Sequence, residues 1–144
     1  MNTSESVIEI TKALGAFQKE CPKIKKDSKG YGYNYASFDS IMDSVKPLLL
    51  RHGIVIIQSV STVDQMTAIT TRLQHANGEY IQDTFCLPAT QMKNVNNVQA
   101  VGASITYGKR YGLSAMLAIA TEDDTDGVHQ QPQAQTQNYQ RRTQ

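Results

Sequence analysis

At 144 residues the chain has room for one domain, and its net charge is only +1. The charge is uneven, because residues 1–121 hold 12 Lys and Arg against 9 Asp and Glu (+3), whereas residues 122–144 hold 2 against 4 (−2). The two cysteines are isolated, without CxxC spacing, so the sequence indicates neither a zinc site nor a disulfide framework. No apolar run approaches membrane-spanning length and no signal peptide is recognisable, so we expect a soluble, cytoplasmic protein without a membrane partner.

Two helices are expected in the first half of the chain. The first, at about residues 5–20, has apolar positions at spacings of three and four along one face, namely Val7, Ile10, Leu14 and Phe17. Ser6 and Glu9 form the pattern of a capping box at its start. Ser37 is placed to cap a second helix, whose apolar residues are Ile41, Val45, Leu48 and Leu49.

Three segments rich in β-branched and aromatic residues follow, with the sequences IVIIQSVSTV, MTAITTRLQH and EYIQDTFCL. The last two are joined by Asn77 and Gly78, a dipeptide typical of a two-residue type I′ hairpin turn. These segments predict a three-stranded antiparallel meander.

A third helix, started by an Asn-x-x-Gln cap at Asn96 and Gln99, is expected to run to about residue 117. We therefore predict an α+β fold, in which a β-β-β-α core of meander and packed helix is preceded by two helices. From EDDTDG onward apolar residues become scarce, and the last 15 residues contain seven glutamines. Such a composition predicts an acidic, then Gln-rich, disordered tail over residues 122–144, behind a domain that spans residues 1–121.

The segment GASITYGKRYGLSA, residues 102–115, resembles a nucleotide-binding loop only superficially. A P-loop requires four residues between its glycines and a Ser or Thr after the lysine, whereas five residues separate Gly102 from Gly108, and Arg110 follows Lys109. The segment also does not follow a strand directly. A P-loop is therefore excluded.

On a helix, this segment has two different faces. Gly108 and Gly112 lie on an apolar face, where the absence of side chains allows close packing on the sheet; its other members are Val101, Ile105, Ala115 and Met116. Each glycine costs a helix about 1 kcal/mol relative to alanine, so that close packing has to compensate. The opposite face carries Gln99, Ala103, Thr106 and Arg110, flanked by Lys109 and by Tyr107 and Tyr111.

Two interpretations of this polar face remain open. A guanidinium, an ammonium and two rings suit contacts with phosphates and stacking on bases. Alternatively, the face is solvated and its tyrosines fill the edge of the core. The loop between the first two helices bears on the choice, because it holds Lys19, Lys23, Lys25, Lys26 and Lys29 followed by Tyr31, Tyr33 and Tyr35 at alternate positions. Alternate side chains of an extended segment share one face, which favours a surface for a single strand over a solvated loop.

Two stretches resemble the ERF (essential recombination function) family of phage single-strand annealing proteins. They are QAVGASITYGKRYGLSAMLAIATEDDTDG and YNYASFDSIMDSVKPLLLRHGI, and the resemblance covers roughly residues 5–127. The positions that match the family pattern are Gln99, Gly102, Thr106, Tyr107, Arg110, Tyr111, Leu113, Asp123, Asp124, Asp126 and Gly127. The chain departs from it at Gly108 and Gly112, where alanine is common, and at Lys109, where arginine is common; lysine keeps the charge but lacks the bidentate fork.

The resemblance implies ATP-independent binding of single-stranded DNA and annealing of complementary strands in phage homologous recombination, by a ring or filament of identical subunits around a shared β-β-β-α core. A single-strand-binding protein or an exonuclease is a further candidate partner, and the location would be the host cytoplasm. No catalytic constellation, metal site or cofactor motif is recognisable, so we expect a protein that is not an enzyme. An alternative is a plain single-stranded nucleic-acid-binding module without annealing activity, and a third is a purely structural protein.

The candidate DNA contacts divide by chemistry. The candidates for phosphate contact are Lys23, Lys25, Lys26, Lys109 and Arg110, and those for base stacking are Tyr33, Tyr35, Tyr107 and Tyr111. Gln99 and Thr106 are candidates for orienting the DNA backbone or bridging subunits.

Overall fold

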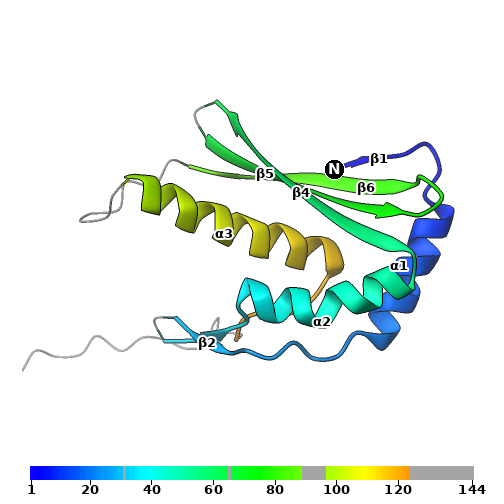
Figure 1. The fold of residues 1–144 in the computed structure, drawn as a ribbon, viewed down its shortest axis with the longest axis horizontal. Helices are drawn as coiled ribbons and strands as arrows, with labels where there is room; N and C mark the ends of the chain where they lie inside the picture. The colour runs from blue at the N-terminus through cyan, green and yellow to red at the C-terminus, as the bar shows by residue number, and fades with distance from the viewer. Residues whose placement is uncertain (31, 65, 89–96, 124–144) are drawn as a thin grey trace, which may run out of the picture.

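Three long strands form the centre of the fold (Figure 1). The computed structural model describes residues 1–30, 32–64, 66–88 and 97–123. β4 (Ile54–Val63), β5 (Met66–His75) and β6 (Tyr80–Leu87) are consecutive along the chain and pair antiparallel. The other elements are β1 (Asn2–Thr3), α1 (Ile8–Glu20), β2 (Ser28–Lys29), β3 (Asn34–Tyr35), α2 (Phe38–Arg51) and α3 (Asn97–Leu117).

The predicted architecture, a three-stranded sheet preceded by two helices, is wrong. The main sheet has four strands in the order β1-β6-β5-β4, because Asn2 pairs with Gln82 and Thr3 with Ile81 at its edge. A second, two-stranded sheet is formed by β2 and β3, which lie between the first two helices along the chain. Strands of two residues are too short to show the alternating pattern that reveals a strand in a sequence, and only their tertiary partners create them.

The turn between β5 and β6 also differs from the prediction. Three residues, 76–78, form the loop, since the His75 N–H donates to the Glu79 carbonyl at 2.8 Å. Gly78 has a positive φ of 96°, whereas Asn77 is not among the residues with positive φ. A type I′ turn requires positive φ at both central residues, so the hairpin closes instead through a turn followed by a left-handed glycine.

The start of α1 is capped by a residue distant in the sequence. The helix begins at Ile8, and its N-cap, Val7, makes no side-chain capping bond. The predicted capping box of Ser6 and Glu9 is therefore wrong. The Glu79 carboxylate instead accepts bonds from the Ser6 hydroxyl at 2.7 Å and the Ile10 amide at 2.8 Å, and these bonds lower its pKa. By contrast, Ser37 caps α2 as predicted, accepting from the Ser40 amide at 3.1 Å.

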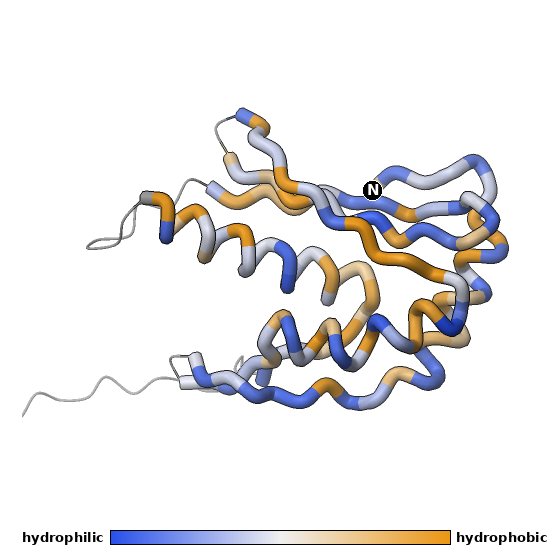
Figure 2. The backbone as a smooth tube through the Cα atoms, in the orientation of Figure 1, coloured by the Kyte–Doolittle hydropathy of each residue, from blue (hydrophilic) through white to orange (hydrophobic). Residues whose placement is uncertain are grey.

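The helices cover one face of the main sheet. α2 and α3 lie on the same side of it, α1 lies at one end, and no helix among the described residues covers the opposite face (Figure 1). The core forms between these layers and contains, among others, Phe17, Ile41, Leu49, Ile54, Leu73, Leu113 and Leu117. Figure 2 shows that hydrophobic residues occur in α2 and α3 and along the start of β4.

The glycines of α3 set its distance from the sheet, as predicted. A Cβ added at Gly108 would lie 2.6 Å from Ile69 Cγ1, and one at Gly112 would lie 3.0 Å from the Thr71 hydroxyl. The remainder of the predicted apolar face is partly wrong, because Val101 and Ala115 are exposed while Leu113 and Leu117 are buried. α3 packs on α2 as well as on β5 and β6, so its buried surface is wider than one apolar stripe.

We predict that Gly108→Ala lowers the free energy of unfolding by about 1–2 kcal/mol, because overpacking against the buried, β-branched Ile69 outweighs the gain in helix propensity. Urea denaturation measures the change. Gly102→Ala is the matched control, since no atom lies within 4 Å of its added Cβ; we expect it to stabilise by up to about 1 kcal/mol. Equal effects of the two substitutions would contradict the close packing.

Candidate nucleic-acid interface

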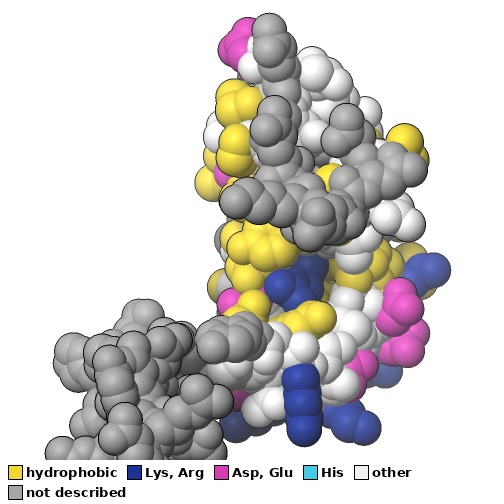
Figure 3. Space-filling model, turned by 90° about the vertical axis from the view of Figure 1, so that its left-hand side faces the viewer, with side chains coloured by type: hydrophobic (Ala, Val, Ile, Leu, Met, Phe, Trp, Pro, Cys, Tyr) yellow, Lys and Arg dark blue, Asp and Glu magenta, His cyan; other side chains and the backbone are white. Residues whose placement is uncertain are grey.

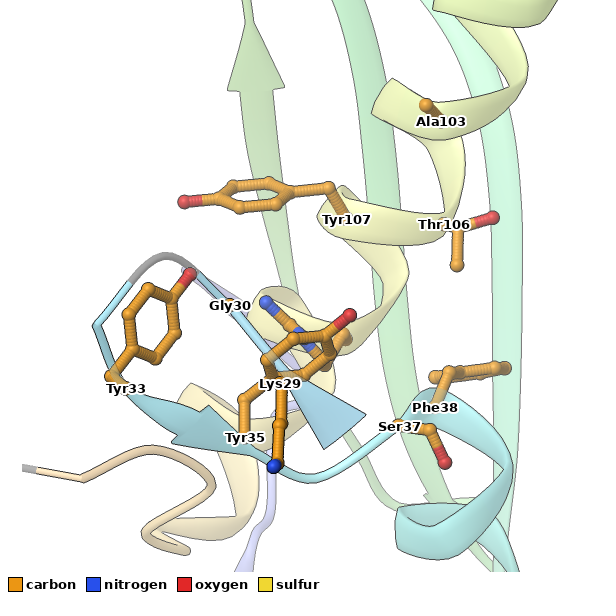
Figure 4. A pocket seen from close by; sticks show the side chains of 10 residues that line it. Lys29, Gly30, Tyr33, Tyr35, Ser37, Phe38, Ala103, Thr106 and Tyr107 are labelled. Carbon is orange, nitrogen blue, oxygen red and sulfur yellow. The ribbon is translucent and has the colours of Figure 1, made fainter. Parts of the chain in front are cut away.

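An open cleft of about 540 Å³ separates α3 from the β2–β3 hairpin and the start of α2. The residues that line it, which together we call the aromatic cleft, are Lys29, Gly30, Tyr33, Tyr35, Ser37, Phe38, Ala103, Thr106, Tyr107 and Arg110. Figure 3 shows this face, with a basic side chain in a hollow bordered by hydrophobic groups and further basic side chains below. In Figure 4 the rings of Tyr33 and Tyr35 rise from the hairpin, and Tyr107 reaches toward them from α3.

The segment after α3 holds the hairpin in place. The Ala36 amide donates to the Thr121 carbonyl at 2.7 Å, and the Asp123 amide donates to the Asn34 carbonyl at 3.1 Å. Tyr35 and Glu122 form an antiparallel bridge between these bonds. Residues 121–123 thus pair with residues 34–36 in the manner of a third strand beside β3.

Arg110 lies at the centre of this arrangement. Its side chain is only 9% exposed, and a terminal guanidinium nitrogen donates to Glu122 Oε1 at 3.0 Å. The guanidinium carbon lies 4.3 Å from the ring centroid of Tyr35 and 4.9 Å from that of Tyr111, which are cation–π distances. Arg110 Nε has no hydrogen-bond partner among the described residues. The arginine is therefore buried rather than on a solvated helix face, yet it lines the cleft and retains an unused donor.

The two tyrosines of α3 differ in how accessible their rings are. Tyr107 and Tyr111 contact each other, with ring centroids 4.1 Å apart, and the centroid of the stacked Phe85 ring lies 6.4 Å from that of Tyr111. The Tyr111 hydroxyl donates to Glu122, and burial together with this bond raises its pKa, so the phenol stays protonated. Tyr107 is 44% exposed. Tyr107 thus offers an accessible ring, whereas Tyr111 packs against that ring and is hydrogen-bonded to Glu122.

On the hairpin, Tyr33 and Tyr35 lie with their ring centroids 6.0 Å apart. The Tyr33 ring packs directly on the backbone of Gly30, where an added Cβ would meet it at 2.6 Å. Tyr31 lies outside the described residues. Both described hairpin tyrosines are half-buried and line the cleft, so the alternation predicted for this segment does place rings on one surface.

The lysines separate into one that is paired and several that are not. Lys26 Nζ lies 2.6 Å from Asp123 Oδ1, and the Asn34 backbone and side-chain amides both donate to Asp123 Oδ2 at 3.0 Å. Chiefly through the bond from Lys26, the pKa of the Asp123 carboxyl falls to about 2. Four other lysines line the cleft or are predicted DNA contacts, namely Lys23, Lys25, Lys29 and Lys109. None of them forms an ion pair within the described part of the chain.

The structure brings together part of the predicted set. The predicted residues that line the cleft are Tyr33, Tyr35, Thr106, Tyr107 and Arg110. Tyr111, Lys26 and Lys109 do not line it, while Lys23 lines a separate hollow of about 370 Å³. Gln99 is exposed on α3 but does not line the cleft, and Thr106 donates to the Gly102 carbonyl at 3.2 Å.

Sequence reasoning missed the role of two acidic residues, Glu122 and Asp123, which we call the acidic clip. Both belong to the EDDTDG segment, for which the sequence predicts a disordered tail, but both contact the domain through Arg110, Tyr111 and Lys26. No spacing pattern links carboxylates to partners about 12 and 97 positions away. The remainder of the predicted tail, residues 124–144, and the predicted cap at Asn96 lie outside the described residues.

The described residues contain no group of three or more His, Cys, Asp or Glu side chains arranged to hold a metal ion. Among the same residues, no helix combines the length and the apolarity needed to span a membrane.

Comparison with known families gives one match. The model of the family described as the ERF superfamily matches residues 10–144. No curated protein and no solved structure matches the chain.

We predict that Asp123 of the acidic clip stabilises the fold less as the pH falls. The depressed pKa of Asp123 means that its ionised form stabilises the fold fully above its ordinary value of 3.8, and that this contribution is lost as the pH falls toward about 2. Over that interval, the free energy of unfolding of Asp123→Asn should therefore fall less than that of the wild-type protein. Urea unfolding at each pH measures both. Asp43→Asn, which changes an exposed carboxyl on α2, is the control. An unchanged pH profile in Asp123→Asn would contradict the role of the clip.

Proposed function

The chain belongs to the ERF superfamily, and on that premise we propose that it binds single-stranded DNA in the aromatic cleft and anneals complementary strands without ATP during phage homologous recombination. In this proposal the chain acts as a binding protein rather than an enzyme and uses no cofactor. The observation that carries the proposal is the buried Arg110, which lines a cleft of tyrosine rings with an unsatisfied Nε–H.

Arg110 is the candidate for a phosphate contact. Its Nε lacks a partner, which costs about 1–3 kcal/mol, but this atom is closed to solvent, so an oxygen from a ligand in the cleft reaches it only after the side chain moves. A guanidinium carries five N–H donors in a planar fork, which suits a phosphate whether or not the bond to Glu122 persists. Lys29, which also lines the cleft, adds a second, exposed positive charge.

The rings supply the contact with bases. Tyr107 is exposed on α3, and Tyr33 and Tyr35 face the same cleft from the hairpin. Stacking is tolerant of sequence because every base has a π face. It also leaves the hydrogen-bonding edge of a base free, and annealing requires free edges so that a second strand can pair. A cleft that is open to solvent accommodates both requirements.

The remaining basic residues extend the path of a strand. Lys23 and Lys25 are exposed in the loop between α1 and the hairpin, and Lys109 follows Tyr107 and Gly108 on α3. Each phosphate that a lysine neutralises releases condensed counterions, which makes binding dependent on salt. One such patch binds weakly, so we propose that a ring or filament of subunits repeats it along one strand and multiplies the affinity.

Mixing the protein with two complementary oligonucleotides tests annealing directly. We expect strand pairing to accelerate at low salt without ATP, as followed by fluorescence energy transfer between labelled strands. Binding that slows pairing would assign the chain to plain single-strand binding. An affinity that does not change between 50 and 200 mM salt would remove phosphate contact from the mechanism.

We predict that Tyr107→Ala weakens binding of single-stranded DNA by about 5- to 150-fold, which corresponds to the loss of about 1–3 kcal/mol of stacking. Tyr107→Phe should retain the affinity, because the ring remains. Fluorescence anisotropy with a labelled oligonucleotide measures both. If Phe weakens binding as much as Ala, the hydroxyl rather than the ring makes the contact.

For the cationic contact, Lys29→Ala should reduce the slope of log affinity against log salt by about 1. Lys12→Ala is the matched control, because Lys12 is exposed on α1 and pairs with Glu9, away from the cleft. An equal change in the slope for both variants would show that the effect comes from net charge alone.

A further inference from the structure

The carboxylate of Glu122 occupies a position that suits an anionic ligand. Its Oε1 atom accepts from a terminal guanidinium nitrogen of Arg110 at 3.0 Å and from the hydroxyl of Tyr111. Both donors belong to α3 and converge on one oxygen. The Arg110 side chain is only 9% exposed, whereas that of Glu122 is 29% exposed. The same donors suit a phosphate oxygen, because charge-assisted bonds form with carboxylates and phosphates alike.

Glu122 does not satisfy the guanidinium fully. Nη2 of Arg110 donates to it, but Nε has no partner among the described residues. A guanidinium can hold a carboxylate or a phosphate through two parallel N–H bonds, and the single printed bond falls short of that arrangement. An acceptor from outside the chain is not restrained by the adjoining backbone and is free to adopt the two-bond geometry. Glu122 is therefore an incomplete partner for Arg110.

The segment that carries Glu122 is anchored without its side chain. Backbone hydrogen bonds on both sides of Glu122 pair residues 121–123 with residues 34–36. The Asp123 carboxylate adds an ion pair with Lys26 Nζ at 2.6 Å. None of these contacts uses the Glu122 carboxylate. The side chain can thus turn outward into solvent while the segment stays on the hairpin.

We propose that Glu122 occupies the place of a phosphate in the DNA-free protein, and that a phosphate of single-stranded DNA displaces it from Arg110 and Tyr111. The exchange presupposes the proposed function, because the phosphate arrives through the cleft that Arg110 lines. Two bonds to a carboxylate break and equivalent bonds to a phosphate form, so the buried cation keeps an anionic partner throughout. Departure of Glu122 also frees the guanidinium to move, and Nε then reaches the ligand.

The exchange gives Tyr111 and Glu122 distinct roles in binding. Tyr111 contacts DNA through its hydroxyl rather than by stacking, since its ring packs against that of Tyr107. Glu122 lowers the affinity of the cleft, because every phosphate has to displace an internal anion first. A weak, reversible contact suits annealing, in which a bound strand has to shift its register until complementary bases meet.

Replacing Glu122 with glutamine tests the exchange. Glu122→Gln keeps the acceptor oxygen and the size of the side chain but removes its charge. We expect this variant to bind a labelled single-stranded oligonucleotide about 10-fold more tightly than the wild-type protein, because hydrogen bonds to an ionised acceptor are about twice as strong as those to a neutral one. Fluorescence anisotropy at one fixed salt concentration measures both affinities, and circular dichroism verifies the fold.

Asp39→Asn is the matched control for net charge. Asp39 is exposed in the first turn of α2, next to Phe38 of the cleft, and forms no ion pair among the described residues. Its substitution removes the same charge and should change the affinity by less than about twofold, because an exposed charge is screened by salt. Equal tightening by both variants overturns the exchange, since net charge alone then accounts for it.

The other outcomes separate the exchange from the proposed function. If the wild-type protein binds the oligonucleotide and Glu122→Gln binds it equally or more weakly, the exchange is wrong and the proposed function stands. Weaker binding would mean that Glu122 positions Arg110 for DNA instead of competing with it. If neither protein binds at low salt, both proposals are wrong.

A double-mutant cycle places the effect at the guanidinium. Arg110→Met keeps an unbranched side chain but removes the charge. In that background Glu122→Gln should change the affinity by less than about twofold, because the carboxylate no longer occupies a phosphate site. An equal 10-fold gain in both backgrounds overturns the exchange. Should circular dichroism show that Arg110→Met is unfolded, the comparison of Glu122→Gln with Asp39→Asn decides alone.

Discussion

The contact of Arg110 with Glu122, surrounded by tyrosine rings, is the interaction on which the cleft depends. It joins α3 to the segment after it, and that segment in turn pairs with β3. A charge pair that is buried costs desolvation, and excellent geometry is needed to repay it. Here the rings of Tyr35, Tyr107 and Tyr111 face the guanidinium, and Tyr111 shares the Glu122 carboxylate. The same few side chains thus shape the cleft and place a cation in it.

The position of this pair follows from how α3 lies on the sheet. Gly108 and Gly112 bring the helix backbone close to Ile69 and Thr71. Arg110, two residues from each glycine, is thereby directed away from the sheet and toward the hairpin. Gln58 of β4 adds to this attachment by donating to the Lys109 carbonyl at 3.0 Å and to the Thr71 hydroxyl at 2.9 Å. A helix with larger residues at both glycine positions would stand further from β5.

The cleft and the edge of β4 lie on different parts of the molecule and differ in chemistry. The cleft presents rings and cations and is stabilised by the acidic clip, whereas β4 presents an uncharged edge with exposed valines and isoleucine.

The sequence by itself determined the long elements, because their signals are local. The helical spacing of Ile10 and Phe17, the cap at Ser37 and the β-branched runs of β4 to β6 each depend on neighbours along the chain. It also identified half of the residues that line the cleft, because their chemistry suits a nucleic acid; they are Tyr33, Tyr35, Thr106, Tyr107 and Arg110.

Only the tertiary structure decided the features that join distant segments. The strand at β1, the cap of α1 by Glu79, the β2–β3 sheet and the acidic clip all pair groups with no periodic relation in the sequence. The burial of Arg110 belongs to the same class, because a helical wheel places it on the polar face and the hairpin then covers that face. Local patterns report which side of a helix is polar, but what packs against that side depends on the path of the whole chain.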